Sequence, residues 1–321
     1  MVQLLLVIIY ISFISLGLPD ALLGSAWPSM YREMGVPVSY AGIISMIISF
    51  GTIISSLQSD RLTKKLGAGM VTAVSVAMTA AALFGFSVSG SFPVLCLWAV
   101  PYGLGAGSVD AALNNYVALH YTSRDMSWLH CMWGVGTIVG PYVMGYALTN
   151  GMTWNRGYFI ISVLQIVLSA ALFFSLPIWR KMEKKGTEGQ HESGTESRKA
   201  LRLKEIIRIP GAKEIMVTFF CYCAVEQTAM LWGSSYMVLH NGLTAEEAAS
   251  YASLFCIGIT VGRFFNGFLM MRFTDNQMIR AGQAVIIAGI VILLLPFGKV
   301  TAVGGLILIG LGCAPVYPCI I

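Results

Sequence analysis

The chain has 321 residues, of which 56% are hydrophobic and only 11% are charged. Ordinary soluble domains carry about 25% charged residues, so this composition excludes that class and indicates a protein that crosses a membrane several times. The formal net charge of +5 would suit a nucleic-acid partner if the basic residues formed one binding surface. Their distribution along the chain instead follows membrane orientation, so we exclude nucleic acid as a partner.

The seven cysteines lie in or at the edges of apolar segments. None has the spacing of zinc ligands or of a secreted disulfide framework, so we interpret them as small apolar packing residues. The sequence contains no phosphate-binding loop, metal triad or nucleophile elbow. It therefore predicts a protein that is not an enzyme and that uses no metal or cofactor.

A helix needs about 20 apolar residues to cross the hydrocarbon core of a membrane, and ten stretches of the chain satisfy that requirement. The first has no basic region before it and no clear cleavage site, so we interpret it as a retained span. The predicted fold is an all-α polytopic membrane protein. The predicted spans are residues 2–30, 39–60, 67–89, 92–119, 130–150, 157–179, 212–239, 246–270, 277–297 and 300–321.

The first span is interrupted by the sequence LGLPDALLGSAWP. Pro19 cannot donate a hydrogen bond to the carbonyl of Ser15, which predicts a kink, and Asp20 follows it near the middle of the membrane. Transporters place binding sites at broken helices of this kind. We therefore predict that Asp20 belongs to a substrate or proton site; the alternative is that it only satisfies backbone groups at the kink.

Between the second and third spans, SSLQSDRLTKKLG predicts a tight cytoplasmic turn. Membrane orientation alone explains its basic residues Arg61, Lys64 and Lys65. Asp60 contributes nothing to orientation, so we expect it to cap a helix or to pair with Arg61 or Arg124.

The fourth span carries Asp110, Asn114 and Asn115 within PYGLGAGSVDAALNNYVALH. Asp110 and Asn114 are four residues apart and share one face of a helix, while the glycines of PYGLGAG let another backbone come close. An Asp at the centre of a membrane helix costs about 2.5–3.5 kcal/mol on insertion scales. This cost favours a polar site facing a water-filled path; the alternative is a polar pair that only joins two helices.

The fifth span contains GVGTIVGPYVMG. Gly136 and Gly140 form a pair of small residues on one helix face, and Pro141 follows them, which predicts close helix packing with a bend rather than ligand contact. Trp133 lies deeper than an interfacial anchor. Packing in the membrane belt is the commoner role for such a residue, and stacking on a ligand ring is the alternative.

Two later spans carry charges. Glu226 and Gln227 lie in the middle of the seventh span, where they indicate a polar interior or a helix–helix hydrogen bond. Arg263 lies in the eighth span, about one to two turns from its predicted cytoplasmic end. It is expected either to extend to the interface or to pair with a carboxylate.

One long hydrophilic segment separates six spans from four. We predict a six-helix bundle over residues 1–179, a flexible cytoplasmic linker over 180–211 and an incomplete bundle of four spans over 212–321. With the N-terminus in the cytoplasm, sixteen of the 20 lysines and arginines fall in cytoplasmic loops and three in outer loops. The positive-inside rule then fixes the orientation and accounts for the net charge without nucleic acid.

The sequence resembles the major facilitator superfamily. SDRLTKK resembles its signature between spans two and three, with Ser56 and Thr63 where glycines are usual, and GVGTIVGP is similar to its span-five motif. GLPDALLGSAWP and PYGLGAGSVDAALNNYVALH resemble the fucose–galactose–glucose proton symporter branch, in which acidic residues of spans one and four serve proton and sugar binding. The resemblance implies that Asp20 and Asp110 are the coupling carboxylates.

The family has twelve spans, whereas this sequence stops at CAPVYPCII within the tenth. The resemblance therefore implies a twelve-span fold that lacks its last two spans. In the family, the aspartate between spans two and three works against the start of span eleven, so Asp60 is expected to lack that partner. The expected conformational-switch loop consists of Asp60, Arg61, Lys64, Lys65 and Arg124.

Together these features predict a secondary active transporter in the cell (inner or plasma) membrane that takes up a sugar or similar small polar solute with protons. Its expected partners are the solute, protons and the lipid bilayer. The alternatives are a drug or metabolite exporter of the same superfamily and a truncated membrane protein that does not transport. The predicted substrate and proton site consists of Asp20, Asp110, Asn114, Asn115, Glu226 and Gln227.

Overall fold

The structure is a computed structural model that describes residues 2–121, 123–190, 205 and 207–320. Within these residues, the regular secondary structure is α-helical, and ten candidate spans are long and apolar enough to cross a membrane. This confirms the prediction of an all-α polytopic membrane protein.

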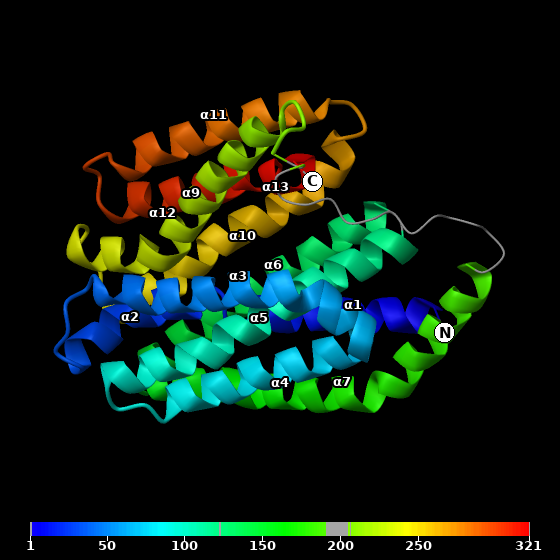
Figure 1. Cartoon of the computed structure of the whole chain (residues 1–321). Coiled ribbons are helices and arrows are strands. Elements are labelled where there is room, and N and C mark those ends of the chain that lie inside the picture. The colour runs from blue at the N-terminus through cyan, green and yellow to red at the C-terminus, as the bar shows by residue number, and fades with distance from the viewer. Residues whose placement is uncertain (1, 122, 191–204, 206, 321) are drawn as a thin grey trace.

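The helices of the first half of the chain are α1 (Val2–Gly17), α2 (Leu22–Glu33), α3 (Tyr40–Leu66), α4 (Ala68–Ser87), α5 (Phe92–His120), α6 (Ser123–Thr149) and α7 (Trp154–Gln190). Those of the second half are α9 (Ala212–Leu239), α10 (Ala245–Leu269), α11 (Asp275–Leu293), α12 (Lys299–Cys313) and α13 (Val316–Ile320). Figure 1 shows them running side by side, with α9 to α13 above α1 to α7.

The two halves meet where α2 lies against α9 and where α6 lies against α10. Glycines bring the backbones together at both places. A methyl group added to Gly24 would overlap the carbonyl oxygen of Met230, and one added to Gly145 would overlap the side chain of Ser250. Close contact of this kind is how helices associate in lipid, where the hydrophobic effect does not drive them together.

Two membrane spans are broken, and a proline explains each break. Helix α1 ends at Gly17 and α2 begins at Leu22, with Pro19 between them, as the sequence predicted. Helix α12 likewise ends at Cys313, and α13 begins at Val316 just after Pro315. Proline has no N–H to continue the helical hydrogen bonds.

The predicted end of the second span was wrong, and two helices run past their apolar residues. Helix α3 continues to Leu66, so SDRLTKK forms its last turns and the connection shrinks to Gly67, whose φ is 84°. Lysines near a helix C-terminus are favoured by the helix dipole. Helix α7 continues to Gln190, into the segment predicted as a linker. The rest of that linker prediction falls largely on residues 191–204 and 206, which lie outside the described residues.

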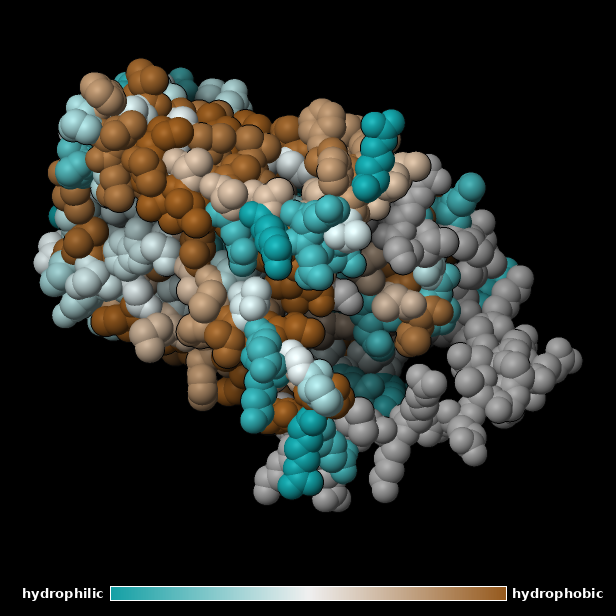
Figure 2. All heavy atoms as spheres, turned by 90° about the horizontal axis from the view of Figure 1, so that it is seen from above, coloured by the Kyte–Doolittle hydropathy of each residue, from teal (hydrophilic) through white to brown (hydrophobic). Residues whose placement is uncertain are grey.

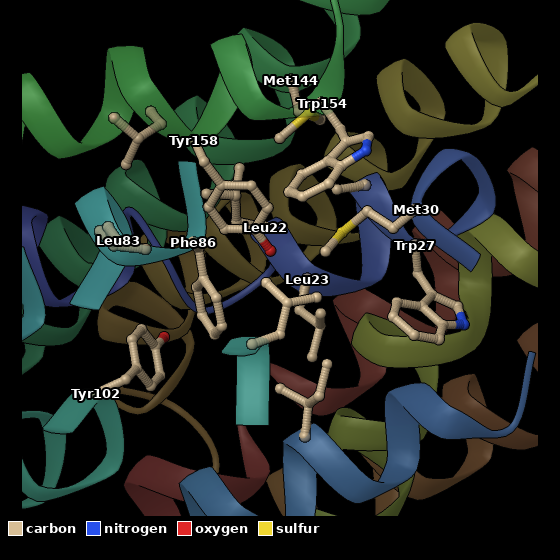
Figure 3. Close-up of a cluster of buried hydrophobic side chains, with 14 of the residues drawn as sticks. Leu22, Leu23, Trp27, Met30, Leu83, Phe86, Tyr102, Met144, Trp154 and Tyr158 are labelled. Carbon is tan, nitrogen blue, oxygen red and sulfur yellow. The ribbon is translucent and has the colours of Figure 1, made fainter. Parts of the chain in front are cut away.

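A buried aromatic cluster fixes α2 within the first half of the chain. Figure 3 shows Trp27 of α2, Phe86 of α4, Tyr102 of α5 and Tyr158 of α7 among buried aliphatic side chains. The rings of Phe86 and Tyr158 lie 5.3 Å apart. This packing holds the broken first span against the helices that carry the polar residues described next.

Apolar side chains also cover much of the outer surface. Exposed leucine, isoleucine, valine and phenylalanine residues occur on most of the helices. Figure 2 shows hydrophobic residues over much of the upper left of the face seen from above, with hydrophilic side chains gathered elsewhere on that face. A surface of this kind suits a protein whose helices face lipid.

Candidate functional site

Asp20 lies at the break between α1 and α2, and side chains from two other helices hold its carboxylate. Trp133 Nε1 of α6 donates a hydrogen bond to Asp20 Oδ2 over 2.7 Å, and the Tyr102 hydroxyl of α5 donates to Oδ1 over 3.4 Å. Backbone bonds close the break itself, including one from Leu22 N–H to the Pro19 carbonyl. The Asp20 carboxylate therefore bonds to side chains of α5 and α6, whereas backbone bonds close the kink.

Asp110 and Asn114 contact each other on one face of α5. Asn114 Nδ2 donates to Asp110 Oδ1 over 2.9 Å, and both residues are half-buried. The Asn114 Oδ1 atom is buried and has no hydrogen-bond partner among the described residues. The acid of the fourth predicted span is thus bonded within its own helix.

Glycines set the position of α5 and, with it, of Asp110. A side chain at Gly103 would overlap the carbonyl oxygen of Ile48, and one at Gly107 would overlap that of Thr52. The Ser56 hydroxyl of α3 donates to the Gly107 carbonyl over 3.0 Å. Helix α5 therefore packs backbone to backbone against α3 just before its polar face begins.

In the second half of the chain, Glu226 is buried and bonds to a tyrosine on its own helix. The Tyr222 hydroxyl donates to Glu226 Oε2, and Arg263 Nη2 of α10 donates to the Tyr222 hydroxyl over 3.5 Å. Arg263 is only 7% exposed, so the expectation that it extends to the membrane interface was wrong. It makes no ion pair within 4 Å among the described residues either.

Aromatic rings join these two polar groups across the halves of the molecule. The Arg263 guanidinium lies 4.7 Å from the ring centroid of Trp133 and 5.8 Å from that of Tyr317 in α13. Since Trp133 also donates to Asp20, a continuous series of contacts runs from Asp20 through Trp133, Arg263 and Tyr222 to Glu226. Trp133 is thus an interior residue rather than part of a membrane belt.

The remaining residues of the predicted site are more open. Asn115 and Gln227 are both exposed, although Asn115 directly follows the half-buried Asn114 and Gln227 directly follows the buried Glu226. Successive residues of a helix point about 100° apart, so neither can share the face of its neighbour. The structure links Asp20 to Glu226 through intervening side chains and Asp110 to Asn114, and leaves Asn115 and Gln227 outside these contacts.

The glycines of the fifth predicted span lie against α1. A methyl group at Gly136 would overlap the carbonyl oxygen of Ile14, and one at Gly140 would overlap that of Leu18. Pro141 follows, buried within α6. This contact places Trp133, one turn before Gly136, beside the break that carries Asp20.

The sequence profile of the Major Facilitator Superfamily matches residues 9–321. The chain belongs to that superfamily of membrane transporters.

Curated relatives are distant. The chain is 27% identical over 299 residues to Bypass of stop codon protein 6 of Saccharomyces cerevisiae, across 86% of this chain and 59% of the yeast protein. It is 26% identical over 305 residues to the uncharacterized transporter y4wD of Sinorhizobium fredii, across 91% and 74%. It is 21% identical over 274 residues to the quinolone resistance protein NorA of Staphylococcus aureus strain Mu50, across 84% and 65%. The chain thus spans about three fifths of the length of the yeast relative.

Solved structures of the superfamily share the fold. The D-xylose–proton symporter aligns with a TM-score of 0.74 at 9% identity, over 98% of this chain and 80% of that one. The transporter FucP in its outward conformation aligns with a TM-score of 0.65 at 16% identity, over 98% and 82%. At these identities the comparison supports the fold of the superfamily alone.

The predicted conformational-switch loop lies apart from the buried polar region of this superfamily member. Asp60 pairs with Lys64 over 2.7 Å, and their side chains are 64% and 74% exposed. Arg61 and Lys65 are exposed beside them. The side chain of Arg124 lies outside the described residues. Asp60 therefore pairs with Lys64, one helical turn away, and not with Arg61; the predicted pairing with Arg124 falls outside the described side chains.

Sequence reasoning did not identify Tyr102, Tyr222 or Tyr317, which supply the hydroxyl groups and rings around the charges. Only Tyr222 carried a local signal, because it lies four residues before Glu226 and so shares its helix face. Tyr102 lies 82 residues along the chain from Asp20, which its hydroxyl contacts. Tyr317 lies on α13, far along the chain from Arg263, which its ring contacts. Their roles depend on tertiary packing.

Proposed function

We propose that this superfamily member takes up a sugar or similar small polar solute together with protons. In this proposal it lies in the cell membrane with its N-terminus in the cytoplasm, as the distribution of lysine and arginine suggests. In the proposed arrangement, residues 1–179 form one bundle of the transporter, residues 180–211 its cytoplasmic linker and residues 212–321 four spans of a second bundle.

The environment of Asp20 carries this proposal. A carboxylate in a membrane span is costly and is retained mainly where it binds or moves ions. Asp20 lies at a helix break, receives side-chain hydrogen bonds from Trp133 and Tyr102, and interacts electrostatically with Asp110 and Glu226. A carboxylate gathered with others in this way can hold a proton in one state of the transporter and release it in another.

The proposed coupling step follows from the contacts of Asp20. A proton on Asp20 or Asp110 removes a negative charge from the interior, which lowers the cost of moving the two halves past each other. Trp133 binds Asp20 and also lies over Arg263, so a change at Asp20 reaches the other half through one side chain. The Asn114 amide, whose Oδ1 has no partner among the described residues, is placed to accept a hydroxyl hydrogen bond from the solute.

One observation favours the exporter alternative. The interior around Arg263 is lined by the rings of Trp133, Tyr222 and Tyr317, with Phe219 packed against Tyr317 at 5.6 Å. Aromatic surfaces suit flat apolar compounds, and one relative is named a quinolone resistance protein. Transport of a labelled sugar and of a quinolone by the same proteoliposomes distinguishes the two functions: sugar transport supports uptake of a polar solute, and quinolone transport supports the exporter.

The test of coupling uses Asp110→Asn in proteoliposomes with an imposed pH gradient and a panel of labelled hexoses and hexuronates. Asn keeps the shape and a hydrogen-bonding oxygen of Asp but cannot ionise. We expect the variant to exchange solute across the membrane and to lose accumulation against a gradient. Glu214→Gln, which removes an exposed carboxylate at the start of α9, is the matched control. Accumulation by Asp110→Asn equal to that of the control would show that Asp110 does not couple proton movement to transport.

A further inference from the structure

The guanidinium of Arg263 has hydrogen-bonding capacity that the protein does not use. Its Nε and Nη1 atoms are buried and have no partner in the part of the chain that the structure describes. Its polar contact there, from Nη2 to the Tyr222 hydroxyl, is 3.5 Å long, beyond the usual range for such bonds. Buried charged groups are normally paired and hydrogen-bonded, so this cation is set up to receive a partner.

Among the described residues, no carboxylate lies within ion-pair distance of Arg263, and the buried carboxylates accept hydrogen bonds from neutral groups. Asp20 is held by Trp133 and Tyr102, Asp110 by Asn114, and Glu226 by Tyr222. The ion pairs among the described residues are Lys64 with Asp60 and Lys299 with Glu247, both at exposed positions. The arrangement therefore differs from a structural salt-bridge network, in which Arg263 would bind an acid directly.

The side chains around Arg263 contact its guanidinium through their rings, so the N–H groups along its edge remain free to bind a planar anion. Trp133 and Tyr317 lie near the guanidinium at 4.7 and 5.8 Å, and such ring contacts satisfy the charge without using its N–H groups. The N–H groups of a guanidinium point outward in its own plane and match the two oxygens of a carboxylate. A carboxylate bound to Nε and Nη2 would replace only the long Tyr222 contact.

The first half of the chain has an unused acceptor. Asp110 is bonded to Asn114, whose Oδ1 is buried without a partner among the described residues. The interior thus offers free donors on a cation from the second half and a free acceptor from the first. A small solute that carries both a carboxylate and a hydroxyl group complements this pair.

We propose that Arg263 binds the carboxylate of the transported solute, so that the substrate is a small hydroxy acid, such as a sugar acid, rather than a neutral sugar. This inference rests on the proposed transport function, and it assigns the chemical class of the solute. Binding of the carboxylate draws Arg263 from Tyr222 toward the solute, while Tyr222 keeps its hydrogen bond to Glu226.

The test measures ligand binding to the full chain in lipid nanodiscs, by thermal stabilisation and without any gradient. The probes are matched pairs of an acid and its neutral counterpart: D-glucuronate with D-glucose, D-gluconate with D-glucitol, and lactate with propane-1,2-diol. We expect at least one acid to bind about 10- to 100-fold more tightly than its neutral partner, as a hydrogen-bonded charge contributes. Arg263→Gln should abolish that ratio while the weak binding of the neutral partner remains, and Arg263→Lys should restore part of it.

Arg272→Gln is the matched control, because it removes the same charge at an exposed position just after α10. It should retain the wild-type preference for the acid. The proposal is overturned if no acid is preferred by the wild-type chain, a comparison that needs no variant to fold, or if the preference survives in Arg263→Gln. Because binding is measured without a pH gradient, its outcome is independent of whether Asp110→Asn uncouples transport.

Discussion

At the scale of single residues, Trp133 connects the two charged groups on which the proposals depend. Its indole N–H bonds to Asp20 while its ring lies over the Arg263 guanidinium. The first contact is a directed hydrogen bond to a carboxylate, and the second requires only the face of the ring. The two contacts can therefore be separated by a substitution that keeps the ring and removes the N–H.

Trp133→Phe makes that separation. We expect this substitution to keep the ring contact with Arg263 and to remove the shorter of the two hydrogen bonds that Asp20 accepts. Loss of one partner of a buried charged group costs about 1–3 kcal/mol, so the free energy of unfolding in detergent should fall by that amount. Trp128→Phe, at an indole that is 40% exposed, is the control. Equal stability of the two variants would show that the Trp133 hydrogen bond contributes nothing to holding Asp20.

The contacts that sequence predicts at this scale are those within one helix. Asp110 and Asn114 lie four residues apart on α5, so their contact follows from helix geometry alone. Trp133 and Asp20 are 113 residues apart, and only the packing of α6 against α1 brings them together. The burial of Arg263 likewise depends on the rings around it, which is why its position along its own helix left both the interface and a carboxylate partner open.

At the scale of helices, close backbone approach decides which elements can be neighbours. The backbone of α6 meets that of α1 at Gly136 and that of the break after α1 at Gly140, and α5 meets α3 at Gly103 and Gly107. Glycine lets two helices come close enough for van der Waals contact along the backbone, which is a main source of association in lipid. The spacing of the small residues predicted such contacts, but not which helix lay opposite.

Gly136→Ala tests the contact between α1 and α6. The added methyl group would overlap the carbonyl oxygen of Ile14, and forcing extra volume into a packed site typically costs about 1–3 kcal/mol. We expect a lower melting temperature and a weaker hold on Asp20. Gly267→Ala in α10, where nothing lies within 4 Å of the added methyl group, should be neutral or slightly stabilising because alanine favours the helix. Similar melting temperatures for the two variants would contradict the tight α1–α6 contact.

Helix ends were predicted less well than helix centres, for a physical reason. Apolar length marks where a helix enters lipid, but hydrogen bonding continues past the lipid wherever polar residues tolerate helical geometry. Asp60 and Lys64 pair within α3 and extend it, and the chain turns only at Gly67, which adopts a positive φ of 84° that other residues rarely adopt. The centres of the spans, fixed by long apolar runs, were located correctly.

At the scale of the whole molecule, orientation rests on the basic residues. The proposed orientation puts residue 189 in the cytoplasm and residue 150, at the end of α6, outside. In a cysteine-free variant, Gly189→Cys should react with an impermeant maleimide only after the membrane is opened, whereas Asn150→Cys, at an exposed position, should react in intact cells. The reverse pattern would overturn the orientation and leave the fold unaffected.

The way the two halves meet also makes a prediction about conformational change. Helices α2 and α9 touch at Gly24, where an added methyl group would overlap the carbonyl oxygen of Met230 and lie 3.0 Å from the Leu231 Cα atom. Both of these neighbours are backbone atoms, so the clash cannot be relieved by rotating a side chain. Gly24→Ala should therefore force α2 and α9 apart and shift the population toward conformations in which the two halves are separated at this contact.

Spin labels at Arg32→Cys and His240→Cys, near the ends of α2 and α9, measure this opening in a cysteine-free background. In the otherwise wild-type chain we expect one short distance, because α2 lies against α9. Gly24→Ala should lengthen or broaden that distance. Gly304→Ala in α12, where nothing lies within 4 Å of the added methyl group, should leave it unchanged. If Gly24→Ala also leaves the distance unchanged, the contact at Gly24 does not control closure, and the halves must be held together chiefly by the packing of α6 against α10.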